Sequence, residues 1–353
     1  MTKMKHKFTR RSVLGGMCGA LAAPLIIRAS SAAAASNSVT IATWGGSYGE
    51  TLAKQVFAPF TSETGIKVNV APADFAKVKA QLMIGNVEWD IYDSFASEGA
   101  FGSKKGFWEN LDASLFDSSD LAVPLEEQFA SWYVNTAGIG WDPKRFEAGK
   151  HPANFAEFFD VNKFPGRRAI RAYAEGTLEA ALLGDGVDPK AMYPLDVERA
   201  LKVLGRIKPS VAAWSTSAQQ PITLLQTGEV DFSFTTLNRV KTTNAPGGGA
   251  PLAFSLDQNT LYTECLAVLK GAPNKENAMK LIAYFLRPEV QARVLEPLGL
   301  MPVSKKAAQM ASAEARKWLP DLNNPKNLMT NSAYWAEHNE AVSSRFKEWI
   351  QQG

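Results

Sequence analysis

The sequence has little cysteine, little histidine and no long apolar run outside its first 35 residues. Of the two cysteines among 353 residues, Cys18 lies in that first segment, so Cys265 has no partner for an internal disulfide. A hydrophobic core must therefore hold the fold together without covalent cross-links. The chain also shows no internal repeat and no low-complexity tract after residue 36, which argues against solenoid and disordered classes.

The N-terminal segment has the pattern of an export leader. Residues 1–12 carry five basic residues and no acidic one, and residues 13–27 are apolar or small but too short and interrupted to anchor the chain in a bilayer. We predict a leader over residues 1–35, cleaved near Ala35 to release a soluble exported protein. The segment Thr9–Leu14, T-R-R-S-V-L, resembles the twin-arginine export motif, and an ordinary Sec signal is the alternative.

The apparent basicity of the chain belongs to this leader. The whole sequence has 38 basic and 35 acidic residues, and the leader holds six of the basic ones and none of the acidic ones. The remaining chain therefore has 32 basic and 35 acidic residues, a formal charge of −3. We expect no nucleic-acid partner, because the folded part lacks a basic excess.

The first expected strand, Val39 to Thr43, is followed by a glycine-rich segment and then by a helical pattern from Glu50. We predict that the segment is a loop that presents Trp44, Ser47 and Tyr48. In open α/β sheets ligands bind at the carboxyl ends of strands, so this loop is the first candidate for a recognition site. A second polar loop is predicted at Asp93 and Ser94, where the strand expected over residues 89–93 ends. Both residues are candidates for ligand binding.

Strands and helices alternate through the rest of the chain, which is typical of parallel sheets covered by helices. About 318 residues follow the leader, more than one hydrophobic core usually serves, so we predict two lobes. Two segments, 129–141 and 261–269, stay extended for longer than a single strand needs. We interpret them as crossings between the lobes, with Gly138 and Gly140 as bending points of the first.

Several segments, in the same order along the chain, resemble the periplasmic substrate-binding proteins of ABC importers, and among these the spermidine/putrescine-binding proteins. The matching segments are T-W-G-G-S-Y from Thr43, residues 60–68, 89–93, 132–142, 164–169, 262–268 and 334–337. The resemblance implies a two-lobed type II periplasmic-binding-protein fold, in which mostly parallel sheets flanked by helices are joined by extended hinge strands. We assign residues 37–136 plus 266–301 to lobe 1, and 137–265 plus 302–353 to lobe 2.

The resemblance also implies how a ligand is held. In that family an amine lies between aromatic walls and its nitrogens pair with carboxylates, because a desolvated ammonium group needs an anion and gains from a π face. Trp44 and Tyr48 match the aromatics of the first loop, and Tyr262 and Glu264 match an aromatic and an acid on the returning strand. Trp335 matches another family aromatic, so we place it in the cleft.

Some positions depart from the polyamine pattern. Tyr173 and Gly176 stand where acids are expected, with Glu175 nearby but offset, and Thr236 and Leu300 replace expected aromatics. These differences weaken the case for a pure polyamine. The candidate ligand-binding residues are Trp44, Ser47, Tyr48, Asp93, Ser94, Arg171, Tyr173, Glu175, Thr236, Tyr262, Glu264 and Trp335.

The ligand prediction is a small amine such as putrescine or spermidine. Arg171 on the same segment and Arg239 after a later strand leave a second ligand class open, since a guanidinium binds a carboxylate with two parallel hydrogen bonds. That class is a zwitterion such as 4-aminobutyrate or another amino acid derivative. The expected partner is an ABC permease in the inner membrane; we expect a monomer with no cofactor, no metal and no catalytic residue.

Two other functions compete with this one. The segment Gly45–Gly49 satisfies the G-x-S-x-G pattern of α/β hydrolases with Ser47 as nucleophile. However, His151 has no obvious acid partner in the sequence, and His338 lies in the segment 335–339, which is expected to start a helix. A metal carrier would need clustered tyrosines, histidine and carboxylates, whereas the tyrosines expected in the cleft lie on different segments.

Overall fold

The strands of this protein form one continuous sheet within residues 37–352, the range that the computed structural model describes. The predicted export leader and its cleavage site near Ala35 lie outside that range. The strands are β1 (Ser38–Thr43), β2 (Lys67–Pro72), β3 (Ile91–Phe95), β4 (Phe129–Trp141), β5 (Arg168–Arg171), β6 (Val211–Ser215), β7 (Phe232–Thr236), β8 (Ala253–Phe254), β9 (Thr260–Val268), β10 (Met301–Pro302) and β11 (Leu328–Met329). The main order across the sheet is β2-β1-β3-β9-β4-β7-β5-β6.

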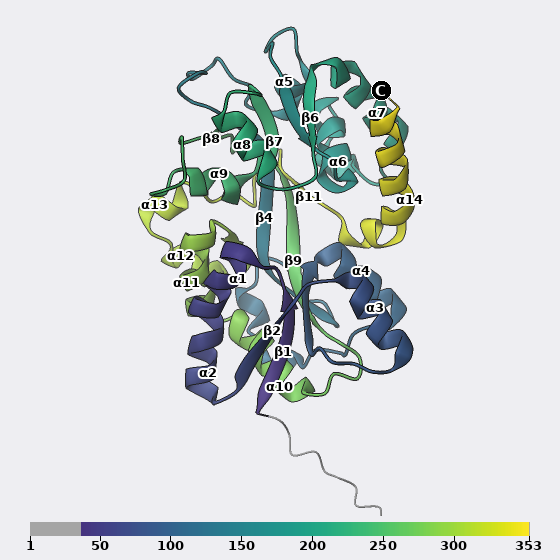
Figure 1. Cartoon of the computed structure of the whole chain (residues 1–353), viewed down its shortest axis with the longest axis vertical. Helices are drawn as coiled ribbons and strands as arrows, with labels where there is room; N and C mark the ends of the chain where they lie inside the picture. The colour runs from purple at the N-terminus through teal and green to yellow at the C-terminus, as the bar shows by residue number, and fades with distance from the viewer. Residues whose placement is uncertain (1–36, 353) are drawn as a thin grey trace, which may run out of the picture. The chain divides into compact units, whose positions relative to one another are not determined.

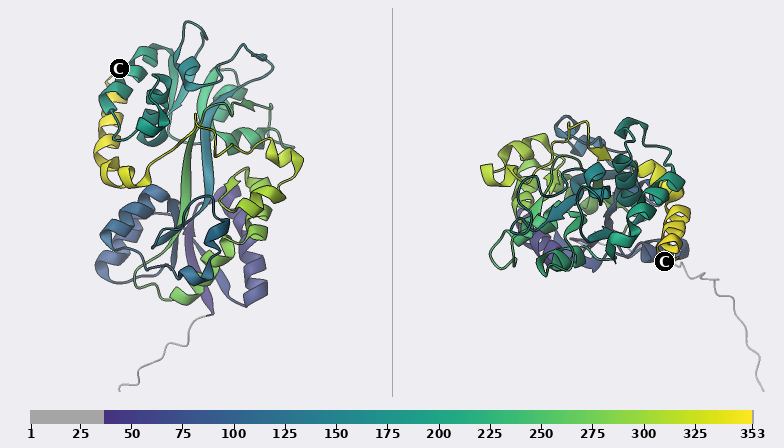
Figure 2. Two further views of the ribbon diagram at one scale, coloured as in Figure 1. Left: turned by 180° about the vertical axis from the view of Figure 1, so that it is seen from behind. Right: turned by 90° about the horizontal axis from the view of Figure 1, so that it is seen from above.

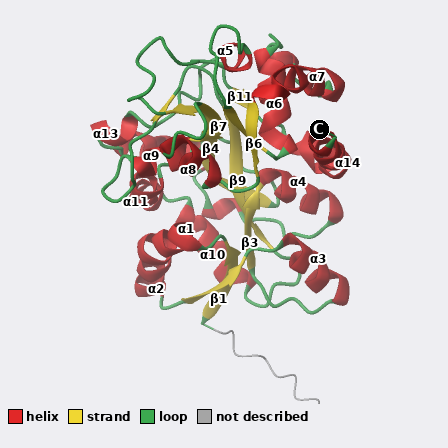
Figure 3. Ribbon diagram, turned by 45° about the horizontal axis from the view of Figure 1, so that its top comes forward, coloured by secondary structure: helices red, strands yellow, loops and turns green. Residues whose placement is uncertain are grey.

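Helices lie on both sides of the strands (Figure 3). They are α1 (Gly46–Leu52), α2 (Ala58–Thr64), α3 (Phe75–Ile84), α4 (Ala96–Lys105), α5 (Phe155–Phe159), α6 (Ala174–Gly184), α7 (Val197–Ile207), α8 (Gln220–Gln226), α9 (Leu237–Thr243), α10 (Lys275–Phe285), α11 (Pro288–Leu298), α12 (Lys305–Met310), α13 (Ala313–Arg316) and α14 (Ser332–Gln351). A π-helical turn at Ala53–Phe57 joins α1 to α2. Within residues 37–352, none of these helices has the length and apolar character needed to cross a membrane.

The sheet has a parallel group of strands at each end. β1 pairs in parallel with β2 and β3, and β5 pairs in parallel with β6 and β7. Each group has its own apolar core, one built around Val39, Phe60 and Phe285 and the other around Leu178 and Phe232. The α/β class predicted from the alternation of strands and helices is confirmed.

β4 and β9 connect the two groups. They pair antiparallel from Phe129 opposite Ala267 to Ala137 opposite Thr260, and Figure 1 shows them running side by side between the two sets of helices. Val134 belongs to the first core and Ile139 to the second, so β4 contributes to both. The two extended crossings predicted from the sequence are therefore these strands.

The helix that follows β1 begins earlier in the sequence than we predicted. Helix α1 begins at Gly46 rather than at Glu50, because Gly46 adopts φ +64°, a left-handed conformation that only glycine tolerates well, and the helix starts at that turn. The predicted loop is thus reduced to Trp44 and Gly45. Tyr48 lies in the first turn of the helix and is held more rigidly than a loop residue would be.

Close packing accounts for a glycine that we had interpreted as a bending point. A Cβ atom at Gly138 would lie 2.4 Å from the Asn259 side-chain nitrogen and 2.8 Å from the ring of Phe254. Asn259 is buried and donates a hydrogen bond to the Ser255 carbonyl at 2.9 Å, so it cannot move aside freely. Gly138 is needed for space at this point of β4.

We predict that Gly138→Ala destabilises the protein by about 1–3 kcal/mol, because the added methyl group overpacks the contact with Asn259 and Phe254. Urea denaturation followed by circular dichroism measures the change. Gly205→Ala is the matched control: Gly205 is an exposed residue inside α7 whose added Cβ would meet its nearest atom at 3.9 Å, so alanine should stabilise by about 0.5–1 kcal/mol. Equal effects of the two substitutions would contradict the packing argument.

Candidate ligand-binding cleft

A cavity of about 480 Å³ lies where elements of both cores meet, and its size is within the usual range for small-molecule sites. Phe95 and Tyr133 come from the strands near the first core, whereas Thr235 comes from β7 near the second. Seven predicted residues line it: Trp44, Tyr48, Arg171, Tyr173, Thr236, Tyr262 and Glu264.

The sheet register places the central carboxylate. β9 lies between β3 and β4, so Glu264 has Phe95 opposite it on one side and Tyr133 on the other. Side chains two residues apart on a strand point to the same face, so Tyr262 joins this face, opposite Asn135 on β4. One face of three neighbouring strands thus presents Phe95, Tyr133 and Tyr262 around Glu264 at the cavity.

Glu264 is buried and hydrogen-bonded but has no cationic partner. It is 5% exposed, and its Oε2 accepts a hydrogen bond from Trp44 Nε1 at 2.8 Å. Burial raises the pKa of Glu264, the nearby Asp93 raises this pKa further, and hydrogen bonds from Tyr133 and Trp44 offset part of the rise. Within residues 37–352, no lysine, arginine or histidine forms an ion pair with Glu264.

Asp93 lies behind the cavity wall. It is completely buried and accepts hydrogen bonds from Thr43 Oγ1 at 2.6 Å, Tyr48 Oη at 2.8 Å and Trp132 Nε1 at 3.4 Å. Burial raises the pKa of Asp93, and these donors counteract the rise. Asp93 therefore fixes the position of Tyr48, a wall residue, without lining the cavity itself.

Two arginines line the same cavity. The guanidinium carbon of Arg171 lies 5.4 Å from the ring centre of Tyr262 and 5.6 Å from that of Tyr173, and its Nη1 is buried without a hydrogen-bond partner. Arg239 lies in α9, directly after β7. In the described part of the chain neither guanidinium is paired with a carboxylate, although six other arginines are. The cavity wall thus carries two unpaired positive groups and one acid.

An adjoining cavity of about 470 Å³ shares Phe95, Arg171, Tyr173 and Tyr262 with the first. The predicted residue Glu175 lines this second cavity rather than the first. Glu175 accepts hydrogen bonds from Ser97 Oγ at 3.0 Å and Thr330 Oγ1 at 3.3 Å. Burial, together with the nearby Glu179, raises the pKa of Glu175 to about 7.

The structure places Ser94 away from both cavities. Because side chains alternate along a strand, Ser94 points to the face opposite Asp93 and Phe95. Its Oγ lies 3.9 Å from the sulfur of Cys265, which is fully buried. The side chain of Ser47, in α1, lies outside what the structure describes.

Trp335 is part of the second core. It is 0% exposed, and its Nε1 donates a hydrogen bond to Glu179 Oε1 at 2.6 Å. Glu179 also accepts hydrogen bonds from Tyr193 Oη and the backbone nitrogen of Gly176. Trp335 therefore supports α6 from within and does not line either cavity, in contrast to its predicted place in the cleft.

Several lining residues escaped the sequence analysis, among them Phe95, Tyr133, Asn135 and Asn238. Period-two alternation would have found Phe95, because it follows Asp93 by two positions on β3. Tyr133 and Asn135 lie in the long crossing β4, where nothing in the sequence shows which face borders a cavity.

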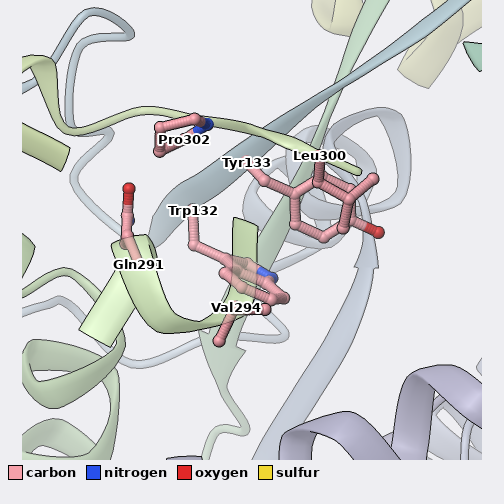
Figure 4. A pocket seen from close by; sticks show the side chains of 6 residues that line it. All are labelled: Trp132, Tyr133, Gln291, Val294, Leu300 and Pro302. Atoms are coloured by element: carbon pink, nitrogen blue, oxygen red, sulfur yellow. The ribbon is translucent and has the colours of Figure 1, made fainter. Parts of the chain in front are cut away.

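Leu300 lies elsewhere, against a small void of about 10 Å³ beside α11. Figure 4 shows Leu300, Val294 and Gln291 around Trp132 and Tyr133. A space of this size holds at most about one water molecule. The void is therefore too small for a ligand, and Leu300 packs behind Tyr133 without contributing to a binding site.

The residues of the competing functions are distributed differently. His151 stacks on Trp141 with ring centres 3.7 Å apart, and His338 lies beside Tyr334 on α14; neither lines the cavity next to Gly45. Tyr48, Tyr173 and Tyr262 do meet at this cavity although they come from different segments. Burial raises the pKa of Tyr48 and Tyr262, which disfavours the phenolate form that binds iron. Among residues 37–352 no three histidine, cysteine or acidic side chains gather around a possible metal position.

We predict that Trp335→Phe lowers the free energy of unfolding by about 1–3 kcal/mol, because the buried Glu179 loses a hydrogen-bond donor. Ligand affinity should change less than about twofold, since the indole lies in the core. Thermal denaturation and calorimetric titration measure the two effects. Trp349→Phe, at a half-buried position on the same helix, is the control and should cost less stability. A large loss of ligand affinity in a stable Trp335→Phe variant would contradict this placement and indicate that Trp335 contacts the ligand.

Comparison with known proteins identifies relatives over nearly the whole chain. The gamma-aminobutyric acid-binding protein of Pseudomonas aeruginosa is 30% identical, covering 98% of this chain and 97% of that protein. The spermidine/putrescine-binding periplasmic protein of Escherichia coli is 25% identical, covering 83% of this chain and 85% of that protein.

Solved structures agree with this relationship. The structure of the Atu4243 GABA receptor has a TM-score of 0.83 and 30% identity, covering 90% of this chain and 98% of that chain. The structure of AgtB from A. tumefaciens R10 in complex with agropinic acid has a TM-score of 0.75 and 32% identity, covering 89% of this chain and 99% of that chain. The predicted two-lobed type II fold is confirmed.

Residues 55–321 match the family described as bacterial extracellular solute-binding protein. The match spans most of the chain, and the relatives and solved structures belong to the same class. The chain therefore belongs to the bacterial extracellular solute-binding proteins, the substrate-binding components of ABC importers.

Proposed function

We propose that this protein binds a small ω-amino acid, of which 4-aminobutyrate is the simplest example, in the cavity that Glu264 shares with Arg171 and Arg239. The observation that carries the proposal is the pair of guanidinium groups without a carboxylate partner on a wall that holds one acid. A ligand with one carboxylate and one ammonium group matches these charges, whereas a polyamine would face two uncompensated positive groups.

The energetics favour such a ligand at both ends. A charge that is moved out of water loses hydration, so each end of a zwitterion needs an opposite charge in the cavity. Arginine supplies the carboxylate end with paired donors, and Glu264 supplies the ammonium end with an acceptor. Aromatic faces around the ammonium group add about 0.5–2 kcal/mol of cation–π attraction. Trp44, Phe95 and Tyr262 are available for this role.

The relatives support a small amine as ligand. The P. aeruginosa protein and the Atu4243 receptor are named for gamma-aminobutyric acid, and other relatives for spermidine, putrescine or agmatine. A polyamine is the second candidate. It is favoured by Glu98 and Glu175, which line the adjoining cavity and would offer acids to a longer amine.

Hinge closure is the proposed binding mechanism. With the lobes divided as residues 37–136 plus 266–301 and 137–265 plus 302–353, β4 and β9 would be the hinge strands. Across the division, Ser97 bonds to Glu175, and Lys104 of α4 pairs with Glu337 of α14, two helices that lie side by side in Figures 1 and 2. A ligand that contacts both lobes stabilises the closed arrangement.

The remaining steps follow from the class of protein. Such proteins pass a small solute to a membrane permease and carry out no chemistry on it, so we infer that this protein is not an enzyme. We further propose export by the twin-arginine leader, release into the periplasm after cleavage near Ala35, and function as a monomer.

We predict that calorimetric titration ranks 4-aminobutyrate above putrescine and spermidine. Butyrate and butylamine, which each lack one charged group, should bind at least about tenfold more weakly, a loss of about 1.4 kcal/mol. Tighter binding of putrescine than of 4-aminobutyrate would favour the second candidate. The absence of binding to every amine would overturn both.

We predict that Arg239→Gln and Glu264→Gln separate the two ends of the ligand. Arg239→Gln should weaken 4-aminobutyrate by at least about tenfold and leave putrescine equal or stronger, because it removes a positive group that only a carboxylate needs. Glu264→Gln should weaken both ligands. Arg287→Gln, which removes a surface arginine paired with Glu63, is the control and should change neither affinity. If Arg239→Gln leaves 4-aminobutyrate binding unchanged, that arginine does not hold the carboxylate.

A further inference from the structure

Two carboxylates are buried close together beneath the aromatic wall. Asp93 stands opposite Leu266, and Phe95 stands opposite Glu264, so Asp93 and Glu264 are diagonal neighbours on adjacent strands. Such neighbours have Cα atoms about 7–8 Å apart on the same face of a sheet. Asp93 is 0% exposed and Glu264 is 5% exposed. Water therefore screens the interaction between the two acids poorly.

Neutral hydrogen-bond donors, rather than cations, contact this pair directly. Tyr48 Oη donates to Asp93 at 2.8 Å, and Tyr133 lies opposite Glu264 on β4. The rings of Tyr48 and Tyr133 are 6.3 Å apart. Burial raises the pKa of both phenols, so they remain neutral donors. In the part of the chain that the structure describes, neither Asp93 nor Glu264 is in an ion pair.

The other titratable and charged groups near Glu264 come from four elements. Glu98 of α4 adds a further negative group, and Cys265 beside it on β9 is a buried thiol whose pKa is raised by burial. Arg171 of β5 and Arg239 of α9 line the cavity and are needed for the ligand carboxylate in the proposed function. Two like charges in a poorly hydrated wall cannot both be ionised without a compensating cation, so the empty site retains a proton.

We propose that Glu264 exchanges this proton for the ammonium group of the ligand, and that Asp93, which does not touch the cavity, is the positioning residue that keeps the proton on Glu264 while the site is empty. The inference rests on the proposed function only in requiring a ligand ammonium group. The exchange is balanced: neutral Glu264 and a protonated amine give a carboxylate–ammonium pair and one proton released to solvent. No bond to carbon changes.

The exchange fixes the direction of the pH dependence. The pKa of Glu264 is raised in the empty site, and a bound ammonium group lowers it. Binding therefore strengthens as the pH rises between the bound and the empty pKa of Glu264, and it levels off above the empty value. A ligand with a hydroxyl group in place of the amine, such as 4-hydroxybutyrate, releases no proton.

Calorimetric titration of the purified protein with 4-aminobutyrate at about pH 7, in buffers of different ionisation enthalpy, counts the protons released. We expect between about half a proton and one proton per ligand in the wild type and none in Glu264→Gln. Asp93→Asn should still bind but release fewer protons than the wild type, because the like charge that raises the pKa of Glu264 is gone and only burial still raises it. Glu276→Gln, at an exposed position in α10, is the control and should match the wild type.

Each alternative result is informative. A wild type that binds the amine with the same heat in every buffer would overturn the exchange while leaving the proposed function intact. Unchanged proton release in Asp93→Asn would remove Asp93 from the mechanism. If Asp93→Asn does not fold, as judged by circular dichroism, the wild-type affinity measured from about pH 6 to about pH 9 decides: it should rise severalfold and then level off, and a flat profile overturns the exchange.

A failure of 4-aminobutyrate to bind would count against the proposed function alone. The same proton count is then made with putrescine, because the exchange requires only an ammonium group. If no amine binds, both the proposed function and the exchange are wrong.

Discussion

Strand β9 is hydrogen-bonded on both sides, to β3 and to β4, and this double pairing positions the site. It sets Glu264 between Phe95 and Tyr133, with Asp93 one diagonal step behind. A register shift of one residue would send Glu264 into the layer that now holds Cys265 and would bring Cys265 to the cavity. The same strands connect the two apolar cores, so the geometry of the cleft and the cohesion of the fold depend on one set of backbone hydrogen bonds.

The electrostatics of the cleft depend on how deeply its charged side chains are buried as well as on their sign. Glu264 is buried and close to a second acid, Asp93. Arg171 and Arg239 line the cavity wall, and in the described part of the chain neither forms an ion pair with a carboxylate. A protein built only for stability would pair these groups internally, as it does Asp231 with Arg145 and Arg167. Because Glu264 is not paired with Arg171 or Arg239 in the empty cleft, a ligand that carries both an ammonium group and a carboxylate can pair with all of them.

The sequence predicted the elements of the fold better than the faces of its strands. The alternation of strands and helices, the first strand and the two long crossings follow from local periodicity, which is why they match the structure. Trp44 was predicted from its place after the first strand, whereas Tyr262 and Glu264 were predicted through the family resemblance, and all three line the cavity. Ser94 and Trp335 were placed in the cleft without considering the face of the strand or helix that carries them. Phe95 and Tyr133 were missed because the side of β3 and β4 that borders open space is decided by tertiary packing.

Gly138 was interpreted as flexible because glycine in a strand often marks a bend, yet here neighbouring side chains leave no room for a larger residue. Local sequence does not reveal such contacts, since Asn259 and Phe254 lie more than a hundred positions further along the chain.

Cys265 is the single cysteine within residues 37–352, and its side chain is fully buried next to Ser94. Thiol reagents that act from solvent cannot reach it in the folded state. Two cysteines introduced one on each lobe would therefore be the two reactive thiols of residues 37–352 to which a fluorescent dye or spin label attaches. The native residue need not be removed, so interlobe distances could be followed during solute capture in an otherwise unaltered protein.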